Sequence, residues 1–98
     1  MTEAHLKDKC MKALKEHGGF ALKVHGGLYQ KRGIPDILYW FNGRSFAIEL
    51  KLPQDLHPLS KLQERQLILM NRQNVITGVA RTLEEFISII ETETGNFP

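Results

Sequence analysis

Apolar residues in the first 17 positions of the chain recur at the spacing of one helical turn. Leu6, Cys10 and Leu14 are four residues apart, so they form one stripe along an α-helix. Thr2 can cap the start of this helix, and the two glycines that follow His17 provide the left-handed backbone positions that end it. The pattern therefore predicts a first helix that buries one face.

Four later segments have the β-branched, aromatic and apolar composition of short strands, namely residues 20–25, 36–41, 44–50 and 75–80. The dipeptide Asn42-Gly43, between the second and third of these, is typical of a two-residue hairpin turn. Glycines follow the first strand, and the polar, basic residues 28–33 predict a loop.

Two capping boxes mark the starts of two further helices. Ser60 with Gln63 predicts a helix after a loop that contains two prolines, and Thr82 with Glu85 predicts the last helix. The last helix carries an apolar stripe at helical spacing, formed by Leu83, Phe86, Ile87 and Ile90.

The expected order is α-β-β-β-α-β-α, which predicts an α/β fold in a single domain over residues 1–98. Both faces of the central hairpin carry apolar side chains, so we expect a mixed sheet with helices on both sides. The aromatic residues of this hairpin are expected in the core: Tyr39, Trp40, Phe41 and Phe46.

Composition narrows the class of protein. With 42% hydrophobic and 24% charged residues the chain is expected to fold as a globular domain, and no apolar run is long enough to span a bilayer. The charged N-terminus predicts that there is no secretory signal. Cys10 is the only cysteine, which argues against a disulfide framework or a cysteine-rich zinc site and fits a reducing cytosol. Glycine pairs without phosphate-loop spacing give no reason to expect a nucleotide cofactor.

Charge is distributed unevenly along the chain. All 13 Lys and Arg residues lie at or before Arg81, where 7 acidic residues leave a charge of +6. The other four acidic residues follow in the last predicted helix. A basic body with an acidic C-terminal segment is compatible with a polyanionic partner, although many small domains without such a partner have similar charges.

The hairpin turn sets a register that brings two carboxylates together. If Phe41 pairs with Arg44, then Asp36 lies opposite Glu49, where like charges destabilise a sheet unless they are compensated. Lys51 lies on the same face as Glu49. The compensation is either a divalent cation, which prefers carboxylate oxygens, or a local salt bridge with Lys51.

Glu3 lies near the middle of the core-facing stripe of the first helix. It is either a third acidic group that reaches a shared cation, or an ordinary first-turn acid that interacts with the helix dipole.

The segment from Gly33 to Asp36, followed by Glu49-Leu50-Lys51 across a hairpin, resembles the PD-(D/E)XK nuclease superfamily. More narrowly, the chain resembles the virus-type replication-repair nuclease (VRR-NUC) family in its short stand-alone form. Glu3 in the first helix, the segment 23–26 and the Ser60–Gln63 segment support this resemblance, which extends from Glu3 to Phe86.

The resemblance implies a site for Mg²⁺ or Mn²⁺. Asp36, Glu49 and the backbone carbonyl of Leu50 would bind the metal, and Glu3 would complete the site directly or through water. Lys51 would contact the attacking water or the scissile phosphate, and Gln63 would help to orient that lysine or water.

The activity that the resemblance implies is metal-dependent cleavage of branched DNA, in the manner of a Holliday-junction resolvase, by a homodimer in the cytoplasm of a bacterium or a phage-infected host. The candidates for contact with DNA are Lys23, His25, Tyr29, Lys31, Arg32 and Arg44. Two alternatives stay open: a non-catalytic nucleic-acid-binding module on the same fold, and a small structural protein in which the charged residues form a local ion network.

Overall fold

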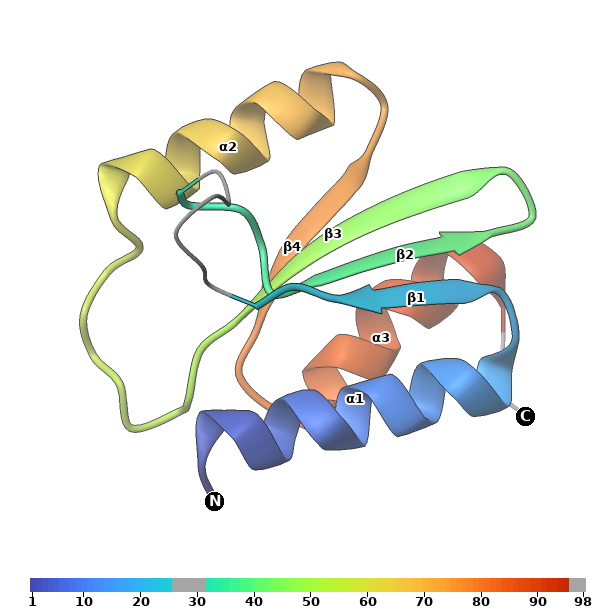
Figure 1. Ribbon diagram of the computed structural model, residues 1–98, viewed down its shortest axis with the longest axis horizontal. Coiled ribbons are helices and arrows are strands. Elements are labelled where there is room, and N and C mark those ends of the chain that lie inside the picture. The colour runs from blue at the N-terminus through green and yellow to red at the C-terminus, as the bar shows by residue number, and fades with distance from the viewer. Residues whose placement is uncertain (26–31, 96–98) are drawn as a thin grey trace.

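The computed structural model describes residues 1–25 and 32–95, and Figure 1 shows its seven elements in the predicted order. The three helices are α1 (Glu3–His17), α2 (Lys61–Arg72) and α3 (Leu83–Thr94). The four strands are β1 (Phe20–Lys23), β2 (Ile37–Phe41), β3 (Arg44–Leu50) and β4 (Ile76–Ala80). The predicted α/β fold with a mixed sheet is therefore confirmed.

The strands form one sheet in the order β1-β2-β3-β4. The first two pairings are antiparallel, and β3 pairs with β4 in parallel because α2 connects them as a crossover. Asn42 and Gly43 both adopt positive φ angles, 48° and 78°, as a two-residue hairpin turn requires. Phe41 pairs with Arg44 and Ile37 with Ile48, so the predicted register is correct.

Polar caps begin each helix where the sequence predicted. The hydroxyl of Thr2 accepts a hydrogen bond from the backbone N–H of His5 at 3.1 Å. Ser60 and Gln63 form the complete capping box at the start of α2. These caps satisfy backbone donors that would otherwise lack a partner, and so they fix where α1 and α2 begin.

The core lies between the sheet and the two helices α1 and α3. Leu6, Cys10 and Leu14 of α1 are buried, as the stripe predicted. They pack with inward-facing residues of the strands and of α3, namely Ile37, Tyr39, Phe46, Ile48, Leu50, Ala80, Phe86 and Ile90. This core positions the ends of β2 and β3 rigidly relative to the start of α1.

The opposite face of the sheet is only partly covered. On this face α2 packs mainly against β4, while Phe20, Leu22 and Trp40 on β1 and β2 are 63%, 46% and 42% exposed. The expectation that Trp40 belongs to the core is therefore wrong. The hairpin sequence is apolar on both faces, but the crossover places α2 over the far half of the sheet, and the Trp40 ring packs instead against Phe20, with ring centroids 5.6 Å apart.

None of the helices in the described part of the chain combines the length and apolar character needed to cross a bilayer.

Candidate functional site

Several chain segments meet at one end of the sheet. Strand β1 ends there, β2 begins, β3 and β4 end, and the N-termini of α1 and α2 lie on the same side, at the left of Figure 1. We call Asp36 and Glu49 the acidic pair. These two residues and those predicted to act with them all lie on these segments or on the residues next to them.

Asp36 immediately precedes β2 and is fixed by the backbone of β3. Its Oδ2 accepts a hydrogen bond from the backbone N–H of Leu50 at 2.8 Å. The Asp36 carbonyl accepts the N–H of Val24 at 2.8 Å, which continues the β1–β2 pairing past the end of β1. The carboxylate is thus held in one place by main-chain contacts.

Glu49 lies beside Asp36 and is 5% exposed. Burial first, then a hydrogen bond to Asp36 and the charge of Asp36, raise the pKa of Glu49 from 4.5 to about 9. This shift favours the protonated form of the Glu49 carboxyl, which can donate a hydrogen bond to Asp36. The close approach of two carboxyl groups that the hairpin register predicted is present.

Lys51 is 9% exposed, and its ammonium group faces the loop that follows β3. Its Nζ lies 3.4 Å from Asp55 Oδ2 and 3.4 Å from the carbonyl of Pro58. Lys51 therefore does form a salt bridge, as one alternative predicted. Its acidic partner in the described chain is Asp55, however, and not Asp36 or Glu49.

The loop that holds Lys51 is anchored to the fold by Arg81. The guanidinium Nη1 of Arg81 donates to the carbonyls of Leu52 and Asp55 at 2.9 and 2.8 Å. The backbone N–H and the ring of His57 contact Asp55 Oδ1, both at 3.0 Å, and the backbone hydrogen bond is the main cause that lowers the pKa of Asp55. Sequence reasoning assigned no role to Asp55 or Arg81, because their contacts with this loop depend on tertiary structure.

Lys7 was also missed. From the second turn of α1 its Nζ lies 3.4 Å from Asp36 Oδ1 and donates to the carbonyl of Val24 at 3.1 Å. The spacing between Glu3 and Lys7 could have predicted this contact. Lys7 follows Glu3 by one helical turn, so the two side chains lie on the same face of the helix.

Glu3 is solvent-exposed at the start of α1. Partial loss of hydration, followed by the negative charge of Asp36, raises the pKa of Glu3 above its ordinary value of 4.5, so its carboxyl group lies within electrostatic range of the pair. Within residues 1–25 and 32–95, no three carboxylate, imidazole or thiol side chains come together closely enough to hold a metal ion. The structure thus brings Asp36 and Glu49 together and leaves Glu3 at the margin.

Gln63 takes part in the cap of α2. Its Oε1 accepts the N–H of Ser60 at 2.9 Å, while its own N–H donates to the Ser60 hydroxyl at 3.1 Å. One turn later Gln66 is buried, with Nε2 3.4 Å from the carbonyl of Arg32. Ser60 and Gln63 therefore serve as a capping box. The suggested contact of Gln63 with Lys51 stays a prediction.

The residues predicted to contact DNA do not form one surface. Lys23 and His25 line a hollow of about 230 Å³ beside the start of α1, together with Glu3, Ala4, Lys7 and Asp8. Lys23 is paired there with Asp8 at 3.1 Å. Arg32 is exposed near α2, and Tyr29 and Lys31 lie outside the described residues.

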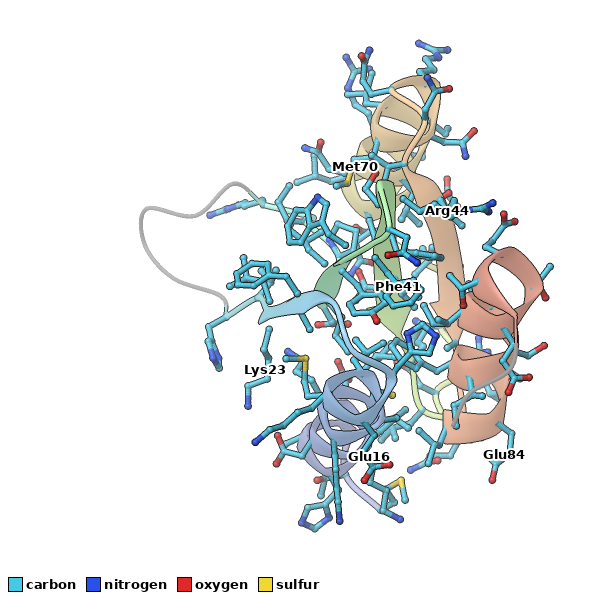
Figure 2. The ribbon with its side chains drawn as sticks, turned by 90° about the vertical axis from the view of Figure 1, so that its right-hand side faces the viewer. Glu16, Lys23, Phe41, Arg44, Met70 and Glu84 are labelled. Carbon is cyan, nitrogen blue, oxygen red and sulfur yellow. The ribbon has the colours of Figure 1, made fainter. Side chains whose placement is uncertain are left out.

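Arg44 lies at the hairpin turn, at the far end of β3 from the acidic pair. It forms an ion pair with Glu93 of α3 at 3.1 Å, and Figure 2 shows it beside that helix, away from Lys23. The structure thus separates Arg44 from Lys23 and His25.

Comparison with known proteins identifies the fold. No protein-family model and no curated protein matches the sequence. Solved structures are similar, however, and two of them each have a TM-score of 0.75 over 93% of this chain. One is described as a VRR_NUC domain, with 18% identity and 96% of its length covered; the other is a VRR_NUC domain protein, with 17% identity and 86% covered. The chain therefore has the fold of the VRR_NUC domain, as the resemblance in its sequence predicted.

Proposed function

We propose that this protein is a metal-dependent nuclease that hydrolyses phosphodiester bonds in DNA. The observation that carries the proposal is the pair of carboxyl groups, Asp36 and Glu49, held together in a nearly buried position at the end of the sheet. Two lysines lie at the same end. A domain that only needed stability would gain nothing from such an arrangement, because buried carboxyl groups side by side cost free energy.

The donor set fits a hard divalent cation. Asp36 and Glu49 offer carboxylate oxygens, and the Leu50 carbonyl would add a third oxygen; Mg²⁺ is often bound by only one or two carboxylates with water and substrate phosphate. When bound, such a metal polarises the phosphoryl group and lowers the pKa of a coordinated water. Glu49 would have to release its proton to act as a ligand, and the Leu50 N–H already fixes the position of the Asp36 carboxylate.

Lys51 would stabilise negative charge on the phosphate. Its ammonium lies 3.4 Å from the Asp55 carboxylate, and this ion pair limits its movement. The loop anchored by Arg81 sets its position. We assign Lys51 to charge stabilisation rather than to proton abstraction, since an ammonium group offers hydrogen-bond donors and a positive charge but no acceptor.

For the substrate we propose branched DNA, in particular a four-way junction, cut by a homodimer. Two coordinated cuts need two sites, and two-fold symmetry is the commonest way to supply them. Support for pairing comes from Phe20, Leu22 and Trp40, three neighbouring apolar side chains left exposed on the open half of the sheet. The acidic α3 lies on the opposite face of the sheet, where it would not meet DNA bound on the side of Glu49 and Lys51.

The proposal is tested by incubating end-labelled four-way junctions and linear duplex of the same sequence with the protein, in Mn²⁺ or in EDTA. We expect cleavage in Mn²⁺ only, with preference for the junction, and none with Asp36→Asn. Glu16→Gln, at an exposed acid in the last turn of α1, is the matched control and should cleave normally. DNA binding without cleavage by the wild type in Mn²⁺ would refute the nuclease and favour a non-catalytic binding module.

A further inference from the structure

Lys7 is a second cation at the acidic pair, in addition to the lysine that the sequence singled out. Its Nζ is 3.4 Å from Asp36 Oδ1, and its side chain is 16% exposed. Asp36 Oδ2 is the acceptor for Leu50 N–H. Both oxygens of Asp36 are therefore already engaged, one by a backbone donor and one by an ammonium group.

The position of the Lys7 ammonium is fixed by the backbone. Nζ also donates to the carbonyl of Val24 at 3.1 Å, and the N–H of Val24 donates to the carbonyl of Asp36. The ammonium is thus hydrogen-bonded to Val24, whose own backbone hydrogen bond helps to position Asp36. A long lysine side chain on a surface usually forms ion pairs of little consequence, but this one is mostly buried and has two acceptors.

The charges around the pair determine how many metal ions the site can take. Four acidic groups interact there, Glu3, Asp36, Glu49 and Asp55, together with the two ammonium groups of Lys7 and Lys51. Once Glu49 has lost its proton to become a metal ligand, the four acids and the two lysines have a net charge of −2, which one divalent ion neutralises. Without Lys7 the charge would be −3, and a second ion would be attracted.

We propose that Lys7 limits the site to a single divalent cation, because its ammonium occupies Asp36 Oδ1 and supplies the positive charge that a second metal ion would otherwise bring. Lys7 is a positioning residue in this scheme, since it acts through Asp36. The inference rests on the proposed metal-dependent function, but it concerns a property of the protein that can be measured without DNA and without catalysis.

The test is a calorimetric titration of the metal-free protein with Mn²⁺ at pH 8. We expect one ion per chain for the wild type. Lys7→Met should bind Mn²⁺ about tenfold more tightly and take up a second ion, because a unit of positive charge has been removed close to the ligand. Lys7→Arg, which keeps the charge, should behave as the wild type does.

Lys9→Met is the matched control, because Lys9 is exposed on α1 about 200° around the helix from Lys7. It should leave both stoichiometry and affinity unchanged. Circular dichroism establishes whether each variant is folded, and the wild-type stoichiometry tests the inference even if Lys7→Met does not fold.

The outcomes separate this inference from the proposed function. Two ions per wild-type chain, or identical titrations of wild type and Lys7→Met, would refute the role of Lys7 and leave a metal-dependent nuclease standing. A wild type that binds no Mn²⁺ would overturn both. Binding of one Mn²⁺ without cleavage of any DNA would remove the nuclease proposal alone.

Discussion

Replacing Glu49 with glutamine should stabilise the metal-free protein, and should do so increasingly as the pH rises. Glu49 is 5% exposed and lies against Asp36, so its charged form is unfavourable in the folded state. Glutamine keeps the size of the side chain and can donate a hydrogen bond to Asp36, as the protonated carboxyl does. It cannot ionise.

The size of the effect follows from the shift in pKa. The pKa of Glu49 is raised from 4.5 to about 9, so between these values the folded state keeps a proton that the unfolded state has lost. The free energy of unfolding of the wild type therefore falls by about 1.4 kcal/mol per pH unit in this window. At pH 7 the contribution of Glu49 to the free energy of unfolding is about 3 kcal/mol lower than in acid. This contribution is present in full only below pH 4.5.

The assay is thermal unfolding by circular dichroism in EDTA from pH 5 to pH 8.5. One kcal/mol changes the Tm of a domain this size by roughly 4–8 °C, so Glu49→Gln should exceed the wild type by about 10 °C or more at pH 7.5. At pH 5 the two should differ by a few degrees. Glu16→Gln, at an exposed position of α1, should change Tm little at any pH.

The reasoning would be refuted if the difference in Tm between Glu49→Gln and the wild type stayed constant across this pH range. Such a result would show that Glu49 does not titrate with a raised pKa. Metal ions provide an independent check. Mn²⁺ at 100 times its dissociation constant should stabilise the wild type by about 2.7 kcal/mol, and should give Glu49→Gln much less. A wild-type Tm indifferent to metal would argue against the site itself.

Three other predictions concern the remaining parts of the proposal. Lys51→Ala should lose most cleavage but keep DNA affinity within a few-fold, because several other phosphate contacts persist; equal loss of both would make Lys51 part of a binding surface. Gln63→Ala should lower the free energy of unfolding by about 1 kcal/mol through its half of the capping box, and its cleavage rate should lie between those of wild type and Lys51→Ala. Sedimentation at micromolar concentration should show a dimer, and a monomer that cuts duplex as readily as junctions would refute junction resolution while leaving a nuclease.

The order of elements and the hairpin register were predictable because both depend on local sequence. Asn42-Gly43 specifies a two-residue turn, and the turn fixes every pair between β2 and β3. The proximity of Asp36 to Glu49 follows from that register without any knowledge of the rest of the fold. Capping residues are local in the same way, which is why the starts of α1 and α2 were also correct.

Contacts between elements distant in sequence were not predictable in this manner. Lys7 reaches Asp36 only because α1 packs with its N-terminus at the same end of the sheet, and Arg81 reaches the loop at Leu52 only because β4 is parallel to β3. Exposure of Trp40 likewise depends on which half of the sheet α2 covers. Periodicity shows that a side chain is apolar, but it does not show how far a single helix extends over a sheet face.

The proton on Glu49, the ammonium of Lys7 and the proposed metal ion would all compensate the same excess of negative charge. In the metal-free protein the raised pKa favours the neutral form of Glu49, and Asp36 is paired with Lys7. A divalent ion that uses Glu49 as a ligand must displace the proton, so binding becomes tighter as the pH rises toward the pKa of Glu49. Lys7 is not displaced in this way, because it is covalently part of α1 and hydrogen-bonded to Val24. In the proposed site, the removable positive charge of the proton would be exchanged for a metal ion, and the permanent charge of Lys7 would remain.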